Sequence, residues 1–194
     1  MLSTSGGVAV LGTTPLPRAL KNLPVIGLDD VADQRRVIVT GSAADLAAVL
    51  ARLLTADRLD VEVAHATTGW SARRALGAAA RRVPLIRDET GTVIVSAAEW
   101  RGRDGAPLLG EAIVDDAVLF DGEAPGVRVE PTLSMPGVRA AVLSARGRPR
   151  GWVSGRAAQL GTPGAQVIRD GVTAPRPVRR STFYRHTEGW LRVG

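Results

Sequence analysis

The 194-residue sequence contains no cysteine, two histidines and a single lysine. Without cysteine there is no disulfide, thiol nucleophile or thiolate-bound zinc, and His65 and His186 are too few for an all-histidine metal site. No apolar run approaches the roughly 20 residues that a membrane-spanning helix needs. The first residues also lack the basic stretch that opens a secretory signal. We therefore expect a cytoplasmic protein, either free or peripheral to a membrane, in which any metal chemistry would depend on carboxylates.

The positive charge is concentrated in the last quarter of the sequence. The net charge is +6, and 24 of the 25 basic residues are arginine, which together with the many Ala, Gly and Val residues is typical of a GC-rich bacterium. Residues 146–194 contain ten arginines against Asp170 and Glu188, whereas residues 1–145 have a slight acidic excess. This asymmetry indicates an anionic partner, with a solvated basic face as an equal alternative.

The first part of the sequence has a β-α-β pattern. Residues 1–36, rich in Gly, Pro and Thr, predict a loop with a short helix in the segment RALKNL. Apolar periodicity then predicts a strand, a helix and a strand, over Val37–Thr40, about Ala43–Leu54 and Leu59–Ala64.

The start of the helix in this unit carries two interpretations. Ser42 and Asp45 have the spacing of a capping box. Gly41 ahead of a helix N-terminus could hold a phosphate, but a lone glycine is more often structural.

The composition of the sequence changes after a second predicted helix, Ser71–Arg82. From Pro84 onward, short apolar runs alternate with Gly, Pro and Asp, which predicts antiparallel strands. The segment RDETG and the Asp-Gly pairs at 121–122 and 170–171 predict hairpin turns, and RGRPRG at 146–151 an exposed loop. We expect an α+β fold, with a small α/β part over 1–82 and an antiparallel β-sandwich-like domain over 83–194.

The order of these pieces resembles the later portion of the bacterial diacylglycerol kinase and lipid kinase family, whose fold is related to that of NAD kinase. LGTTPLPRAL (Leu11–Leu20) is similar to the family's glycine-rich segment in Gly12, Thr13 and its closing Arg-Ala-Leu. DLAAVLARLLTADRLDVEVAHA, GRAAQLGTPGAQVIRDGVTAPRPV and GWLRV are similar to later elements. The resemblance implies that Gly12 and Thr13 lie near a nucleotide and that Asp170 stands where the family has a general base.

The sequence departs from this family in its phosphate-binding parts. No GGDGT loop occurs in it, the family's Asn-Asp pair falls near Thr14 and Pro15, and Val172 replaces the glutamate of Asp-Gly-Glu. Phosphate binding needs several converging backbone N–H groups, and no cradle for ATP is evident. We therefore expect a degenerate, non-catalytic relative rather than an active kinase.

The segment APRPVRRSTFYRHTEGW combines arginines with aromatics. Pro175 and Pro177 exclude a regular central strand, so Arg176, Arg179 and Arg180 are expected on an extended, partly exposed edge, available to an anion. Candidate ligand-binding residues here are Arg176, Arg179, Arg180, Arg185 and Tyr184. Alternation along a strand places Phe183 with Arg185 on one face and Tyr184 with His186 on the other, so at least one aromatic belongs to the core.

Two sets of titratable residues have both functional and structural interpretations. His186, near Glu188, is a weak candidate for a general base, with a structural histidine the stronger alternative. Asp115, Asp116, Asp121 and Glu123 could bind Mg²⁺, but their spacing along one strand favours strand and turn roles.

The sequence thus predicts a degenerate lipid-kinase-like protein that binds a phosphorylated or lipidic small molecule, with no cofactor identified. One alternative is a nucleic-acid-binding module that uses the basic, aromatic C-terminal quarter. Another is an interaction protein that forms a homodimer through an edge strand.

Overall fold

The computed structural model describes residues 6–12 and 15–194, and the chain divides into two compact units. Unit 1 comprises the residues up to 83 together with 188–194, and unit 2 comprises 84–187. Strands predominate over helices, and the predicted α+β class is confirmed. No helix in the described part of the chain is both long and apolar enough to span a bilayer.

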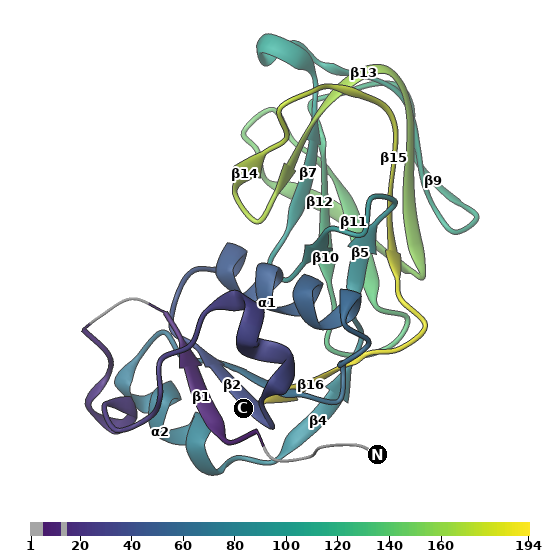
Figure 1. The fold of residues 1–194 in the computed structure, drawn as a ribbon. Helices are drawn as coiled ribbons and strands as arrows, with labels where there is room; N and C mark the ends of the chain where they lie inside the picture. The colour runs from purple at the N-terminus through teal and green to yellow at the C-terminus, as the bar shows by residue number, and fades with distance from the viewer. Residues whose placement is uncertain (1–5, 13–14) are drawn as a thin grey trace. The chain divides into compact units, whose positions relative to one another are not determined.

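Unit 1 is built on a five-stranded sheet, drawn in Figure 1. Across the sheet the strands are β1 (Val8–Leu11), β2 (Arg36–Val39), β3 (Glu62–His65), β16 (Trp190–Val193) and β4 (Ala80–Val83). The first four are parallel and β4 is antiparallel to β16. The predicted β-α-β unit is therefore confirmed, whereas β1 lies in a segment that the sequence analysis assigned to a loop. The last strand, β16, pairs with β3 and β4 of this sheet, although the sequence predicted that its residues belong to the antiparallel β domain over 83–194.

The helix after β2 begins as its sequence predicts. Helix α1 spans Ala43–Thr55, and Ser42 and Asp45 form a reciprocal capping box. A Cβ atom at Gly41 would lie 2.2 Å from Asp45 Oδ2, so the glycine leaves room for the capping carboxylate. The apolar face of α1 is buried, through Leu46, Val49, Leu50 and Leu53.

The second predicted helix is shorter than expected. Helix α2 spans Gly69–Gly77 and is capped by Thr68 and Ser71, while residues 80–83 form β4. The prediction of helix up to Arg82 was wrong because a Gly at 77 weakens the helix and β16 offers the following residues a hydrogen-bonding partner. Two short 3-10 helices, η1 (Arg18–Leu20) and η2 (Leu28–Asp33), connect β1 to β2.

Unit 2 is an antiparallel β structure. Its strands in chain order are β5 (Ile86–Asp88), β6 (Val93–Ile94), β7 (Ala98–Arg101), β8 (Leu108–Val114), β9 (Ala117–Ala124), β10 (Val127–Pro131), β11 (Val138–Leu143), β12 (Pro149–Gly155), β13 (Ala157–Arg169), β14 (Val172–Thr173) and β15 (Val178–Arg185), with a 3-10 turn η3 at Arg103–Gly105. The first half of β13 pairs with β8 and β15, and its second half with β7 and β14. This long strand thus connects the two halves of the unit, whose core includes stacked Trp100 and Phe183.

Some of the hairpin turns predicted from the sequence occur in the structure and others do not. Asp170 and Gly171, both at positive φ, form the two-residue turn between β13 and β14, as predicted. RDETG connects β5 to β6, also as predicted. The turn predicted at Asp121 and Gly122 was wrong, because these residues lie within β9 and pair with β8. RGRPRG is also not all loop, since β12 begins at Pro149.

Candidate functional site

The parallel strands of unit 1 bring several chain segments to one edge of the sheet. In open α/β sheets this edge, beyond the carboxyl ends of the strands, is where ligands bind. Gly12 follows β1, Thr40 follows β2, and His65 ends β3. Gly12 therefore lies at the carboxyl edge of this sheet, and a Cβ there would meet Thr40 Oγ1 at 1.9 Å. Thr13, its predicted partner, lies outside the described residues.

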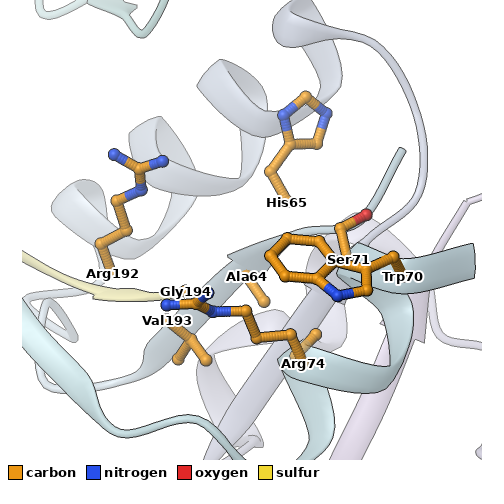
Figure 2. Close-up of a pocket in the computed structure, with 9 residues that line it drawn as sticks. Ala64, His65, Trp70, Ser71, Arg74, Arg192, Val193 and Gly194 are labelled. Carbon is orange, nitrogen blue, oxygen red and sulfur yellow. The ribbon is translucent and has the colours of Figure 1, made fainter. Parts of the chain in front are cut away.

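A cavity of about 260 Å³ opens at this edge, where β3 and β16 meet α2. Figure 2 shows the lining residues, which are Ala64, His65, Trp70, Ser71, Arg74, Ala75, Arg192, Val193 and Gly194. Ala64 and Val193 pack into the core beneath α2 together with Ala75. Because side chains alternate along a strand, His65 and Arg192 project from the opposite face of the sheet, as Figure 2 shows. Among the described residues that line the cavity, none is acidic.

Trp70 and Arg74 form the exposed wall of the cavity. They are one helical turn apart, and the Arg74 guanidinium carbon lies 5.3 Å from the centre of the indole ring. Trp70 is 70% exposed, whereas tryptophan is on average a largely buried residue. Arg74 has neither an ion pair nor a hydrogen bond from its side chain within the described chain. Its charge is therefore available to a ligand in the cavity.

Arg192 contributes a second cation that lacks a counterion. It lies directly opposite Arg81 in the β16–β4 pair, and like charges in this position repel each other. Burial, and after it the charge of Arg81, lowers the pKa of Arg192 below its ordinary value. Neither arginine is paired with a carboxylate in the part of the chain that the structure describes. An anion bound nearby would relieve both the desolvation and the repulsion.

The two helix N-termini at this edge differ in their availability. The Asp45 carboxylate accepts hydrogen bonds from the Ser42 hydroxyl and backbone N–H at the start of α1, and these bonds lower its pKa. This end of α1 is closed by its own carboxylate, which supports the structural interpretation of Gly41. The first turn of α2 contains no acidic residue, and Ser71 of that turn lines the cavity. The partial positive charge of α2 is therefore not neutralised by a carboxylate of its own first turn, although Thr68 and Ser71 cap that turn with neutral hydroxyl groups.

His65 links β3 to the loop ahead of α1. Its Nε2 atom lies 2.9 Å from the carbonyl oxygen of Gly41, and since a carbonyl only accepts, Nε2 carries the proton. The ring is held in place by this bond. It can therefore act as a fixed wall of the cavity.

The structure places Asp170, the candidate general base, within a network of backbone bonds in unit 2. Its Oδ2 accepts from Val95 N at 2.9 Å, and its Oδ1 accepts from Ser96 N at 2.7 Å and Ala97 N at 3.0 Å. Burial raises the pKa of Asp170 above its ordinary 3.8, although the three backbone bonds act in the opposite direction. The carboxylate thus holds the residues after β6 against the turn at Asp170.

The edge expected for Arg179 and Arg180 occurs in the first part of β15, which among the described strands pairs with β13 alone, but the strand is central at Phe183 and Tyr184, which pair with both β13 and β5. The candidate arginines of unit 2 do not share one surface. Arg180 and Tyr184 lie on the same face of β15, where Arg180 lines a shallow hollow of about 250 Å³. Arg179 and Arg185 alternate to the other face, and Arg185 donates to the carbonyl oxygen of Pro136 at 3.0 Å. Arg176 lies before the strand and is exposed. As expected, one aromatic of this strand, Phe183, belongs to the core.

The remaining candidates have local roles in the described structure. The backbone N–H of His186 donates to Leu85, and the Glu188 carboxylate pairs with Arg82 at 2.7 Å. Asp115 accepts from the N–H groups of Arg156 and Ala157, and Asp115 and Asp116 form the turn between β8 and β9. No cluster of three potential metal-ligating side chains occurs among the residues described.

Sequence reasoning missed most of the cavity-lining side chains. Trp70 and Arg74 lie on a helix that directly follows a parallel strand, and this position was itself a usable indication of a site. Arg192 could not be found this way, because its place depends on the return of the chain end to the sheet of unit 1.

Comparison with known proteins gives a likeness in structure only. No protein-family model matches the sequence, and no curated protein matches it. A diacylglycerol kinase from Bacillus anthracis str. Sterne superposes with a TM-score of 0.71 at 10% identity, over 100% of this chain and 98% of that one. The chain has the diacylglycerol kinase and NAD kinase fold. This kinase-like fold also occurs in an NAD kinase from Archaeoglobus fulgidus in complex with ATP, with a TM-score of 0.66 and 12% identity over 98% of this chain and 94% of that one.

A third structure extends the comparison. Yeast NADH kinase complexed with NADH matches 89% of this chain and 65% of its own, with a TM-score of 0.57 and 11% identity. The fold resemblance inferred from the sequence is thereby confirmed. At these identities the kinase-like fold is shared, and the function has to be argued from the residues of this chain.

Proposed function

We propose that the protein binds a phosphorylated small molecule in the cavity at the carboxyl edge of the unit 1 sheet, without transferring its phosphoryl group. The observation that carries the proposal is a cavity lined by Arg74 and Arg192 and by no acidic side chain. The first turn of α2 adds a partial positive charge. These features favour an anion of phosphate size, attached to a group that rests against Trp70.

The absence of phosphoryl transfer is supported by Asp170. A general base needs a free oxygen lone pair directed at the attacking hydroxyl, within about 3 Å. Three of the roughly four lone-pair positions of the Asp170 carboxylate already accept backbone hydrogen bonds, and these bonds tie together two parts of unit 2, so only Oδ2 keeps a free position. The lack of a GGDGT sequence points in the same direction.

The test is thermal unfolding and calorimetric titration with ATP, NADP, phosphatidic acid and inorganic phosphate. A ligand that binds only the folded protein raises its apparent stability. We expect a saturable shift with at least one phosphorylated compound, and loss of that shift in Arg74→Ser.

Arg73→Ser is the matched control, because Arg73 is adjacent on α2 and exposed but does not line the cavity. Equal weakening in both variants would mean that general charge, not the cavity, binds the ligand. Turnover of ATP with diacylglycerol or NAD as acceptor, abolished by Asp170→Asn without loss of stability, would contradict the non-catalytic part of the proposal.

A further inference from the structure

Strand β12 and the turn before it form a basic edge of unit 2. The segment SARGRPRGWVSGR, residues 144–156, contains four arginines and no acidic residue. Strand β12 pairs with β11 and, among the described strands, with no other. Arg146, Arg148 and Arg150 are exposed, and within the described structure none of their side chains forms an ion pair or hydrogen bond. Three neighbouring cations are therefore free to meet an anionic partner.

On the adjoining strands β7, β10 and β11 of the same sheet, arginines are paired with carboxylates. Arg128 bridges Glu99 and Glu130 at 2.9 and 2.6 Å, and Arg139 donates to Glu130 at 2.6 and 3.0 Å. Arg101 pairs with Glu99 at 2.7 Å. Both carboxylates of this row are fully occupied by their own arginines. They leave the excess charge of β12 uncompensated.

An exposed tryptophan lies at the end of this row of ion pairs. Trp152 is 37% exposed, and the Arg139 guanidinium carbon lies 4.3 Å from the centre of its ring. Arg139 is itself fixed by Glu130, so the indole packs against an anchored cation. A β-bulge in β12 includes Gly151, with a φ of 65°, and Trp152, between the pairs Val142–Arg150 and Ala140–Val153. The strand thus presents a held aromatic ring on the face of Arg139, and the unpaired Arg150, two positions earlier and paired with Val142, lies on the other face of the same open edge.

We propose that β12 and its preceding turn bind single-stranded nucleic acid, with Arg146, Arg148 and Arg150 at the phosphates and Trp152 stacked on a base. Basic residues beside an exposed aromatic are the pattern of sequence-tolerant single-strand binding. A duplex keeps its bases stacked and offers the indole no face. A membrane would require further exposed apolar side chains in the segment, whereas Val153 packs against the core and the other neighbours of Trp152 are Gly151 and Ser154.

The same arginines have a competing explanation. Charged residues and proline on an edge strand prevent pairing between copies of a protein, and Pro149 opens β12. That explanation assigns no role to the tryptophan and predicts no dependence on bases. The experiment therefore has to separate stacking from charge.

The measurement is fluorescence anisotropy of a labelled deoxythymidine strand of about 12 nucleotides, a length within the range of single-strand binding sites. We expect affinity that falls with salt, and a double variant Arg148→Ser/Arg150→Ser whose log–log salt slope is smaller by about 1.4, at roughly 0.7 per phosphate contact. Arg18→Ser/Arg103→Ser removes two other exposed, unpaired arginines and should leave the slope nearly unchanged. Trp152→Leu should weaken binding about 5- to 100-fold, while Trp152→Phe retains most of it.

Three results would overturn the proposal. Equal affinity for an abasic strand of the same length would show that phosphate charge alone is bound. Equal losses in the two double-arginine variants would show that the surface charge is not localised at β12. Binding to vesicles containing phosphatidylserine, with none to the strand, would assign the surface to a membrane. Arg74→Ser should bind the strand normally, so the outcome is independent of the proposed ligand cavity; thermal unfolding of each variant checks that it is folded.

Discussion

Replacing Asp170 by asparagine tests whether this carboxylate has a structural or a catalytic role. The carboxylate accepts three backbone N–H groups, from Val95, Ser96 and Ala97. Asparagine has one acceptor oxygen, so if it keeps the bonds to Ser96 and Ala97, its NH₂ group faces the N–H of Val95. The backbone φ of 47° is not disturbed, because asparagine tolerates the left-handed region. The substitution therefore isolates the hydrogen bonds.

The expected cost follows from these bonds. Leaving the Val95 N–H unsatisfied costs about 1–3 kcal/mol, and exchanging a charged for a neutral acceptor weakens the other two bonds by about 1 kcal/mol each. The raised pKa of Asp170 shows that burial penalises its charged form, and asparagine avoids this penalty. The free energy of unfolding should therefore fall by about 2–3 kcal/mol. For a chain of this size that corresponds to a Tm lower by about 5–10 °C.

The assay is urea unfolding at neutral pH, with Asp57→Asn as the matched control. Asp57 also has a positive φ, of 55°, but it is exposed and its carboxylate has no hydrogen bond in the described structure. The control should change stability by less than about 0.5 kcal/mol. If Asp170→Asn is as mild as the control, the carboxylate does not support the fold and the argument against a general base loses its foundation.

Two further substitutions test the ion pairs of the two units. Arg36→Met removes a buried guanidinium that donates to Glu62 at 2.6 Å and to the carbonyl oxygens at the end of α2. In urea unfolding, the free energy of unfolding should fall by about 3 kcal/mol. The control Arg35→Met, at an exposed ion pair with the same glutamate, should lower it by less than about 1 kcal/mol. Burial raises the pKa of Glu130, but hydrogen bonds from two arginines outweigh this and hold it below its ordinary 4.5. The charged Glu130 therefore stabilises the fold fully above its ordinary pKa of 4.5, and this stabilisation is lost as pH falls through the lower pKa of the folded protein. The free energy of unfolding of Glu130→Gln should consequently fall less between about pH 5 and pH 3 than that of the unchanged protein.

Local patterns predicted the elements whose partners are close in sequence. Strand β2, helix α1 with its capping box, and strand β3 follow from apolar periodicity and from Ser42 and Asp45. The Asp170–Gly171 turn follows from the backbone preference of its two residues. In each of these the deciding interactions lie within a few residues, so the sequence pattern contains them.

Elements that depend on distant partners were not predictable in this way. The residues of β4 have ordinary helical propensity and become a strand because β16, more than a hundred positions later, offers a hydrogen-bonding edge. Asp121 and Gly122 have the composition of a turn, yet pairing with β8 carries the strand through them. The cavity shares this property, since Arg74 and Arg192 line it together only because the same return of the chain brings β16 beside β3.

Asp115 and Asp170 show why a motif aspartate need not mark a catalytic site. Each lies at positive φ in a two-residue turn, and each accepts backbone N–H groups from another segment of unit 2. In both, a short acceptor ties a hairpin turn to a neighbouring segment whose donors would otherwise lack partners. Asp115 has this role with no resemblance to any catalytic motif. Because the same geometry accounts for Asp170, its position in an Asp-Gly sequence needs no catalytic explanation.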